Sequence, residues 1–339
     1  MNLSVGIVGL PNVGKSTLFN ALVKRQQAMV ANYPFCTIEP NVGIVPVADE
    51  RIDKLTEMSH SAQKIYATVS FVDIAGLVKG ASQGAGLGNQ FLSHIRETDL
   101  VLYLLRDFND ENVIREGSVA PKDDLETLKT ELILKDLETL NKIKDQKPAS
   151  PIEKLNASLN KGILASEAGL TEEEIAVAKE LCLLTLKPYI VVYNVSENEI
   201  AEKLKNKEAL VICAKMEAEL ATLSETEQKE YLQSLELTES GLERVVRLAY
   251  KKLGLISYLT TGEKETRAWT IHRGDTAPQA AGVIHTDFEK GFIKAEIVKY
   301  GDLITCGGWK QAREAGKARM EGKEYLMQDG DVVEFHFNK

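Results

Sequence analysis

Several features that would assign this sequence to other classes of protein are missing. No apolar run reaches the roughly 18 residues that a membrane helix needs, so no membrane contact is expected. The four cysteines form no C-x-x-C pair, which predicts neither a zinc site nor a disulfide framework and fits a reducing, cytoplasmic compartment. No secretory leader is expected, because its cleavage would destroy the glycine-rich motif that starts at Gly9.

An excess of positive charge is also missing. The 41 lysines and arginines are outnumbered by 50 aspartates and glutamates, which gives a formal net charge of −9. Proteins that coat nucleic acid without specificity are usually basic, so DNA is not expected as a partner. A local basic face on an acidic body remains compatible with this charge. Nothing in the sequence requires a dimer, and a monomer is expected.

What is present is an ordinary hydrophobic share of 44% over 339 residues, enough for two or three domains of roughly 100–200 residues each. Short apolar runs typical of buried strands alternate with stretches of helical character. This alternation predicts an α/β fold with a doubly wound, mainly parallel sheet. The expected strands are 3–10, 67–73, 99–105, 188–194 and 209–214, and the expected helices include 15–25, 88–97 and 240–253.

The region from about 107 to 184 interrupts this rhythm. Apolar residues recur at helical spacing over 123–145 and again over 152–163, and prolines between them end the first helix. We expect a helical hairpin arm with its tip near 147–151. A third helix over 171–184, opened by a capping box, returns the chain to the sheet.

After residue 257, short β-like runs separated by glycine predict a small α+β domain. These runs are 268–272, 282–285, 292–298 and 331–337, with a helix at 309–319. The predicted domains are a sheet domain of residues 1–106 and 185–256, an inserted helical arm of residues 107–184 and a C-terminal domain of residues 257–339.

The segment Gly9-Leu-Pro-Asn-Val-Gly14-Lys15-Ser16 fits the P-loop pattern G-x-x-x-x-G-K-[ST] in full, between a predicted strand and a predicted helix. The glycines let backbone N–H groups curl around a β-phosphate, and Lys15 supplies a positive charge to the β- and γ-phosphates. The Ser16 hydroxyl is placed to ligate Mg²⁺. The segment therefore predicts a site for a purine nucleoside triphosphate with Mg²⁺.

Two further segments stand where an NTPase switch needs them. Thr37 can reach Mg²⁺ only while a γ-phosphate is present, although a loop threonine is more often a plain turn residue. Asp73 is placed to hold a Mg²⁺-bound water, and the Gly76 N–H can meet the γ-phosphate. Leu77 follows where Ras-like GTPases use glutamine to orient the attacking water. Leu77 cannot do this, so we expect slow hydrolysis until a partner completes the site.

The motif that reads the base is altered. GTPases carry Asn-Lys-x-Asp, whose aspartate accepts two hydrogen bonds from guanine, whereas this chain has Asn194-Val195-Ser196-Glu197. Adenine N1 is an acceptor and would be repelled by a carboxylate, so Glu197 is not expected to pair as the aspartate does. The Asn194 carbonyl can accept from the adenine amino group. These changes favour ATP over GTP.

Asn12 lies in the P-loop near the β- and γ-phosphates. Its side-chain carbonyl can ligate a monovalent cation, and K⁺ there would supply the charge that an arginine finger supplies elsewhere. The alternative is that Asn12 only braces the loop.

Taken together, these motifs resemble the YchF family, the Obg-like ATPases of the translation-factor class of P-loop proteins. The resemblance covers essentially the whole chain and is carried by GLPNVGKS (9–16), NYPFCTIEPN (32–41), DIAGLVKGAS (73–82), GLGNQFLSHIRETD (86–99), NVSE (194–197) and the matching part of 267–296. It implies a P-loop NTPase G domain, a helical arm and a C-terminal TGS domain. It also implies slow, ATP-preferring hydrolysis, ribosome binding and a regulatory role in oxidative stress.

By motif position the resemblance implies nucleotide contacts by Asn12, Val13, Gly14, Lys15, Ser16 and Thr17, and base contacts by Asn194, Val195 and Lys215. Many relatives carry a histidine, proposed to help hydrolysis, where this chain has Tyr103. A phenol is a poor base at neutral pH. His94 on the preceding helix is a candidate substitute, although a lone helix histidine is more often simply half-buried.

Ribosome contact needs local positive charge, which two segments offer. They hold Lys310, Arg313, Lys317, Arg319 and Lys323 near the C-terminus, and Lys142, Lys144, Lys147, Lys154 and Lys161 around the arm tip. Contact with ribosomal RNA would weaken steeply with salt, and contact with ribosomal protein less so. Either patch can equally be a solvated face.

Two rival functions stay open. A GTP-dependent ribosome-assembly factor would differ in nucleotide preference. A stress-response binding protein would use the nucleotide as a structural ligand, with hydrolysis incidental.

Overall fold

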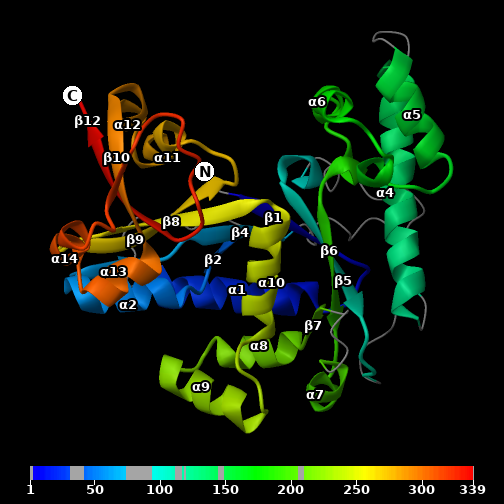
Figure 1. Ribbon diagram of the computed structural model, residues 1–339. Coiled ribbons are helices and arrows are strands. Elements are labelled where there is room, and N and C mark those ends of the chain that lie inside the picture. Colours follow the sequence, from blue (N-terminus) through cyan, green and yellow to red (C-terminus); the bar gives the residue numbers. More distant parts are fainter. Residues whose placement is uncertain are drawn as a thin grey trace. The chain divides into compact units, whose positions relative to one another are not determined.

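The computed structural model describes residues 3–30, 42–73, 94–110, 117, 120–143, 149–204 and 210–338, which form two compact units (Figure 1). The P-loop unit holds Leu3–Val45 and Ser70–Val245, and the C-terminal unit holds Pro46–Val69 and Val246–Lys339. This division differs from the predicted domains chiefly in one segment, 46–69, which groups with the C-terminal residues. The three predicted domains themselves stay a prediction.

A six-stranded sheet lies at the centre of the P-loop unit, in the order β2-β4-β1-β5-β6-β7. β1 pairs in parallel with β4 and β5, and the β5–β6 and β6–β7 pairs are also parallel. β5 is buried along its whole length, as expected for a strand covered on both faces. The predicted α/β fold with a mainly parallel sheet is confirmed. The strands are β1 (Ser4–Val8), β2 (Val42–Pro46), β4 (Thr68–Asp73), β5 (Leu100–Arg106), β6 (Tyr189–Asn194) and β7 (Leu210–Ile212).

Helices separate these strands, as the alternation predicts. α1 begins directly after the P-loop, and the described part of the expected helix 88–97, residues 94–97, is helical. The helices that follow β6 are α7 (Ile200–Lys203), α8 (Ala214–Leu220), α9 (Glu225–Ser234) and α10 (Gly241–Lys252), and α1 spans Lys15–Val30.

The predicted helical hairpin is present as α4 (Pro121–Ile143) and α5 (Ala149–Leu159), which pack together (Figure 1). Pro151, which is expected at the tip, lies in the first turn of α5, where a proline is tolerated. Leu140 of α4 and Leu155 of α5 are fully buried in one shared apolar cluster. The third helix, α6 (Glu172–Lys179), opens with the expected capping box of Thr171 and Glu174 but ends five residues before Leu184, where a 3₁₀ turn, η3 (Leu184–Leu186), begins. No helix within the described ranges is long and apolar enough to cross a bilayer.

A buried carboxylate of the arm hydrogen-bonds the segment that leads from the arm back to β6. Asp136 of α4 is fully buried, and it accepts hydrogen bonds from the Leu184 N–H, the Thr185 N–H and the Thr185 hydroxyl at 2.8, 2.8 and 2.6 Å. Burial raises the pKa of Asp136, while these hydrogen bonds oppose that shift.

The C-terminal unit contains a second six-stranded sheet, in the order β11-β10-β12-β8-β9-β3. Helix α11 (Ala277–Ile284) covers one face, where its alanines pack with Tyr258, Ile297 and Val333. This confirms the α+β fold expected for the C-terminal residues. The strands are β3 (Gln63–Ile65), β8 (Leu255–Thr261), β9 (Glu265–His272), β10 (Phe292–Lys299), β11 (Arg319–Glu321) and β12 (Asp331–Phe337), and the helices that follow α11 are α12 (Thr286–Lys290), α13 (Tyr300–Cys306) and α14 (Trp309–Glu314).

Two predictions in this unit are wrong. Residues 282–285 do not form a strand, because α11 runs to Ile284 after a capping box of Thr276 and Gln279. The expected helix 309–319 ends at Glu314, since Gly316 turns the chain with a φ of 67° before β11.

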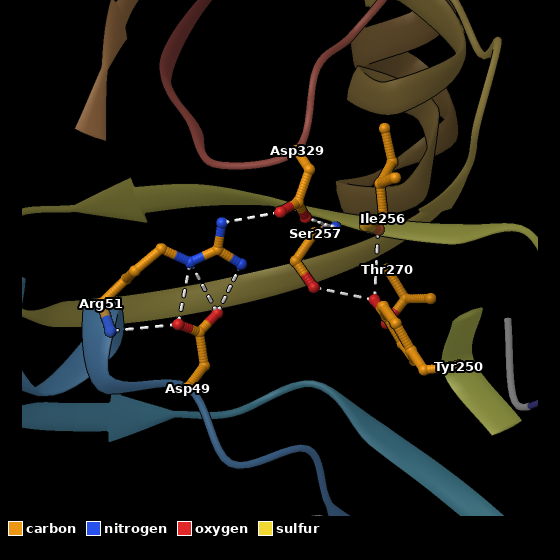
Figure 2. Close-up of polar contacts among 7 residues, drawn as sticks. All are labelled: Asp49, Arg51, Tyr250, Ile256, Ser257, Thr270 and Asp329. Carbon is orange, nitrogen blue, oxygen red and sulfur yellow. Dashed lines mark hydrogen bonds and ion pairs between the residues drawn. The ribbon is translucent and has the colours of Figure 1, made fainter. Parts of the chain in front are cut away.

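The segment 46–69 carries α2 (Glu50–Ser59), which packs on β8 and β9. At the start of α2, Arg51 donates hydrogen bonds from Nε and Nη2 to the Asp49 carboxylate, at 2.8 Å each. Arg51 also forms an ion pair with Asp329 (Figure 2). The other oxygen of Asp329 accepts the Ser257 N–H at 3.0 Å. These contacts join α2, β8 and the loop before β12 within one unit.

Candidate nucleotide-binding site

The P-loop follows β1 at the carboxyl edge of the parallel sheet, where open α/β folds bind ligands. A Cβ on Gly9 would collide with the Leu104 carbonyl oxygen, and a Cβ on Gly14 would collide with the Asn194 side-chain amide. Gly14 has a φ of +96° and Asn12 a φ of 61°, both in the left-handed region. The loop therefore requires its glycines at these two points, and asparagine is among the few other residues that tolerate such a backbone.

The Lys15 side chain is buried and hydrogen-bonded within the P-loop. Its side chain is only 6% exposed, and Nζ donates hydrogen bonds to the carbonyl oxygens of Gly9 and Leu10 at 2.8 and 2.6 Å. Ser16 and Thr17 lie exposed in the first turn of α1. The first turn of a helix favours negative charge, because its N–H groups and dipole point outward. The site thus presents a cation, two hydroxyls and a helix N-terminus at one place.

Asn194 joins two loops of the site. Its Nδ2 donates to the Val13 carbonyl and its Oδ1 accepts the Ala214 N–H, both at 2.9 Å, and the residue is 4% exposed. Both ends of the amide are therefore engaged by the protein. This arrangement assigns Asn194 a positioning role for the P-loop and the turn before α8, whereas its expected hydrogen bond to adenine stays a prediction.

The neighbouring base-contact candidates differ in exposure. The Val195 side chain is 2% exposed and lies in an apolar cluster with Ile200 and Cys213, and its N–H donates to the Ile212 carbonyl at 2.8 Å. Lys215 is exposed in the first turn of α8, directly after Ala214. Of this pair, only Lys215 presents its side chain to solvent near the loops that Asn194 joins.

Glu197, at the guanine-reading position, has a partner that the sequence does not indicate. The Tyr231 hydroxyl of α9 donates to Glu197 Oε1 at 2.7 Å. This hydrogen bond raises the pKa of Tyr231 to about 12, so the phenol stays protonated. The two residues are 34 positions apart, and neither periodicity nor any motif links them.

The far part of α1 is anchored by a polar cluster. Arg25 Nη2 donates to the Ser240 hydroxyl at 3.1 Å and lies 3.8 Å from the buried Glu217 carboxylate, while Nη1 lies 3.7 Å from Glu243. Glu217 also accepts the Gly241 N–H at 2.8 Å. Burial raises the pKa of Glu217, although Arg25 and the backbone donors oppose the shift. The cluster fixes the P-loop helix against α8 and α10.

Several expected switch residues cannot be placed. Thr37, Gly76 and Leu77 lie outside the described residues. Asp73 ends β4, half-buried, and pairs in register with Ile7 of β1, so it reaches the same sheet edge as the P-loop. It can therefore serve, with Ser16, the Mg²⁺ role predicted for it.

Tyr103 is a poor candidate for a general base, and His94 lies exposed in the helix before β5. Tyr103 is 2% exposed, packs edge-on against Tyr189 with ring centroids 5.7 Å apart, and has its pKa raised by burial. The His94 side chain is 48% exposed, and its Nδ1 lies 3.9 Å from Glu97. A buried phenol of raised pKa cannot take a proton from water at neutral pH.

The fold and the phosphate loop define a P-loop nucleotide-binding protein. Residues 4–148 match a family model described as "50S ribosome-binding GTPase", and residues 255–338 match the C-terminal YchF GTPase model described as "Protein of unknown function (DUF933)". Full-length curated relatives are similar throughout, and the chain belongs to the YchF family.

Two of these relatives are named "Ribosome-binding ATPase YchF". The one from Bacillus subtilis is 48% identical over 366 residues and the one from Escherichia coli O157:H7 is 48% identical over 364, each with 100% of both chains covered. The solved structure of the Schizosaccharomyces pombe YchF GTPase is 37% identical, with a TM-score of 0.90, and covers 99% of this chain and 98% of its own.

Proposed function

We propose that this protein is a Mg²⁺-dependent ATPase that prefers ATP over GTP and acts in the cytoplasm as a nucleotide switch on the ribosome. The observation that carries the proposal is the P-loop cradle beside an altered base-reading motif. In the cradle Lys15 Nζ is held by the Gly9 and Leu10 carbonyls, and the motif replaces the lysine and aspartate of GTPases with Val195 and Glu197. The names of the full-length relatives, ribosome-binding ATPases, support the same function.

The residues present fit a Mg²⁺ ion held against phosphates. Ser16 is exposed at the start of α1, Asp73 ends the neighbouring strand, and Thr37 would complete the set. When bound, Mg²⁺ neutralises charge on the phosphates. Lys15 would orient the β- and γ-phosphates, and Thr37 and Gly76 would sense the γ-phosphate. Asn12 is the candidate for holding K⁺ beside them.

Slow turnover is part of the proposal. Leu77 has no group to orient water, and the buried Tyr103 is not a base. Hydrolysis would therefore wait for a partner that completes the site, which suits a switch better than a metabolic enzyme.

Ribosome contact would use the basic residues of the C-terminal unit or of the arm. In the C-terminal patch, Arg313 pairs with Glu296 and Glu334, Lys317 with Asp302, and Arg319 with Glu321. Lys310 and Lys323 are exposed. In the arm, Lys142 and Lys161 are exposed and Lys154 pairs with Glu174, while Lys144 and Lys147 lie outside the described residues. A ribosomal RNA target would show steep salt dependence, and a ribosomal protein a shallower one.

Titration of the purified protein with ATP and with GTP, in Mg²⁺ with K⁺ or Na⁺, tests the nucleotide assignment. The proposal expects ATP to bind about tenfold or more tightly than GTP, which corresponds to about 1.4 kcal/mol. Tighter GTP binding would instead favour a GTP-dependent ribosome-assembly factor. Equal turnover in Na⁺ and K⁺ would remove the role of Asn12.

The stress-response alternative predicts a different outcome. Lys15→Ala should abolish nucleotide binding. If such a variant kept full biological activity, nucleotide hydrolysis would be incidental and the protein would act as a binding protein.

A further inference from the structure

The carboxylate at the guanine-reading position is held by a donor from a helix outside every nucleotide motif. Tyr231 belongs to α9, and its hydroxyl donates to Glu197 Oε1 at 2.7 Å. Glu197 opens a short 3₁₀ turn, η4 (Glu197–Glu199), directly after Ser196. The hydrogen bond thus connects α9 with the loop that the base-reading motif forms.

Packing and helix capping hold the donor in place. The Tyr231 ring packs against the apolar cluster that contains Val195, Cys213 and Leu232. The helix itself is held at its start by a capping box of Ser224 and Glu227. A ring that is packed on one side and a capped helix give the hydroxyl little freedom to leave its acceptor.

The other polar side chains near Glu197 are paired with one another. Glu199, the other carboxylate of the turn, accepts the Ser196 hydroxyl at 2.6 Å and lies 4.0 Å from Lys203. Lys203 in turn pairs with Asp107 at 2.6 Å. Each acidic side chain of this turn therefore has its own partner, and the one facing the phenol is Glu197.

A carboxylate at this position creates a problem for an ATP-selecting site. Guanine offers N1–H and N2–H donors to it, whereas adenine N1 is an acceptor that a free carboxylate would repel. An adenine site that keeps a carboxylate here needs another donor to hold the charge away from the base.

We propose that Tyr231 is a specificity-determining positioning residue, which restrains Glu197 and thereby favours adenine over guanine. This inference rests on the proposed ATP preference. Tyr231 acts through Glu197 and need not touch the nucleotide. Loss of its hydroxyl would free Glu197 to swing toward the base, which weakens ATP binding and strengthens GTP binding.

The test is titration of Tyr231→Phe with ATP and with GTP in Mg²⁺ buffer. We expect the ratio of the Kd for GTP to the Kd for ATP to fall about threefold to tenfold, the size expected for one solvent-exposed hydrogen bond. A merely structural role would weaken both nucleotides equally and leave the ratio unchanged. That outcome, or a rise in the ratio, would overturn the inference.

Tyr189→Phe is the matched control. It removes a similar hydrogen bond, in which the hydroxyl of Tyr189, at the start of β6, donates to Glu167 at 3.0 Å. The nucleotide ratio should not change in this variant. A change of equal size would show that loss of any such phenol acts on the ratio, and would contradict the assignment to Tyr231.

The double variant Tyr231→Phe with Glu197→Gln shows whether the two residues act together. In the Glu197→Gln background, Tyr231→Phe should no longer change the ratio, because the charge that it restrains is gone. An undiminished effect would assign Tyr231 another role and overturn the inference.

The unaltered protein separates failure of this inference from failure of the proposed function. If the unaltered protein prefers GTP, the proposed function fails. If it prefers ATP and Tyr231→Phe leaves the ratio unchanged, only this inference fails.

Discussion

Arg51 and Asp329 are 278 residues apart in the chain, and Arg51 Nη1 lies 2.9 Å from Asp329 Oδ2. Asp329 at the same time accepts the N–H of the buried Ser257. Burial lowers the pKa of the Arg51 guanidinium, but hydrogen bonds to Asp49 and Asp329 outweigh burial and raise it, so the side chain is charged at neutral pH. The segment 46–69 is thereby fixed to the C-terminal sheet by a charged side chain.

Asp329→Ala should destabilise the C-terminal unit by about 1–3 kcal/mol, because it leaves the Ser257 N–H without an acceptor and removes one partner of Arg51. Urea unfolding followed by the fluorescence of Trp269 and Trp309 measures this change. Asp302→Ala, which breaks the exposed 3.2 Å pair with Lys317, is the control and should change stability by less than about 0.5 kcal/mol. Equal effects of the two substitutions would contradict the role given to Asp329.

Gly14→Ala should weaken ATP binding strongly while the rest of the fold persists. The new Cβ would meet the Asn194 amide at a backbone φ of +96°, which costs about 1–2 kcal/mol before any clash is relieved. Binding titration and circular dichroism measure the two effects. Gly262→Ala is the matched control, since a Cβ there meets no atom within 4 Å and its φ is not positive. Normal ATP affinity in Gly14→Ala would refute the steric argument.

Asn194→Ala should lower the affinity for ATP and GTP by the same factor, on the order of tenfold. It leaves the Val13 carbonyl and the Ala214 N–H without their buried partner, which loosens the P-loop whichever base is bound. Titration with both nucleotides decides between roles: a loss confined to ATP would show that the Asn194 carbonyl reads the adenine amino group instead.

Asp136 should make the protein less stable as pH rises. Its folded pKa lies above the unfolded value of about 3.9, so its favourable contribution is complete below about pH 4 and is lost as pH rises through the folded pKa. The unfolding free energy of the unaltered protein minus that of Asp136→Asn, measured by urea unfolding from pH 4 upward, should therefore fall with pH. A difference that rises with pH would mean that the Thr185 and Leu184 donors outweigh burial.

The sequence predicted the parts of the fold whose signals are local. The apolar runs gave β1, β4, β5, β6 and β7, and the P-loop pattern fell between β1 and α1 as expected. The strand predicted at 282–285 failed because Val283 and Ile284 carry a β-like composition inside a helix that Thr276 and Gln279 start. At 282–285 the capping box at the start of α11 therefore outweighed the β-like apolar composition.

Other features could not be predicted because they depend on distant residues. α2 was not expected, since its buried Ile52 and Leu55 become informative only when β8 and β9 cover them. In the site, the engagement of Asn194 by Val13 and Ala214 and the hydrogen bond between Tyr231 and Glu197 join positions 20 to 181 residues apart. Pairings over such separations are set by the packed fold.

From Leu3 onward, the part of the chain that the structure describes passes between its two units three times, after residues 45, 69 and 245. A gene fusion that exchanged only the residues after 245 would leave Ile52 and Leu55, both 0% exposed, without the strands that cover them. The residues after 245 therefore cannot be exchanged between proteins as an independent folding unit. Any chimera that is meant to fold must take residues 46–69 from the same parent as residues 246–338.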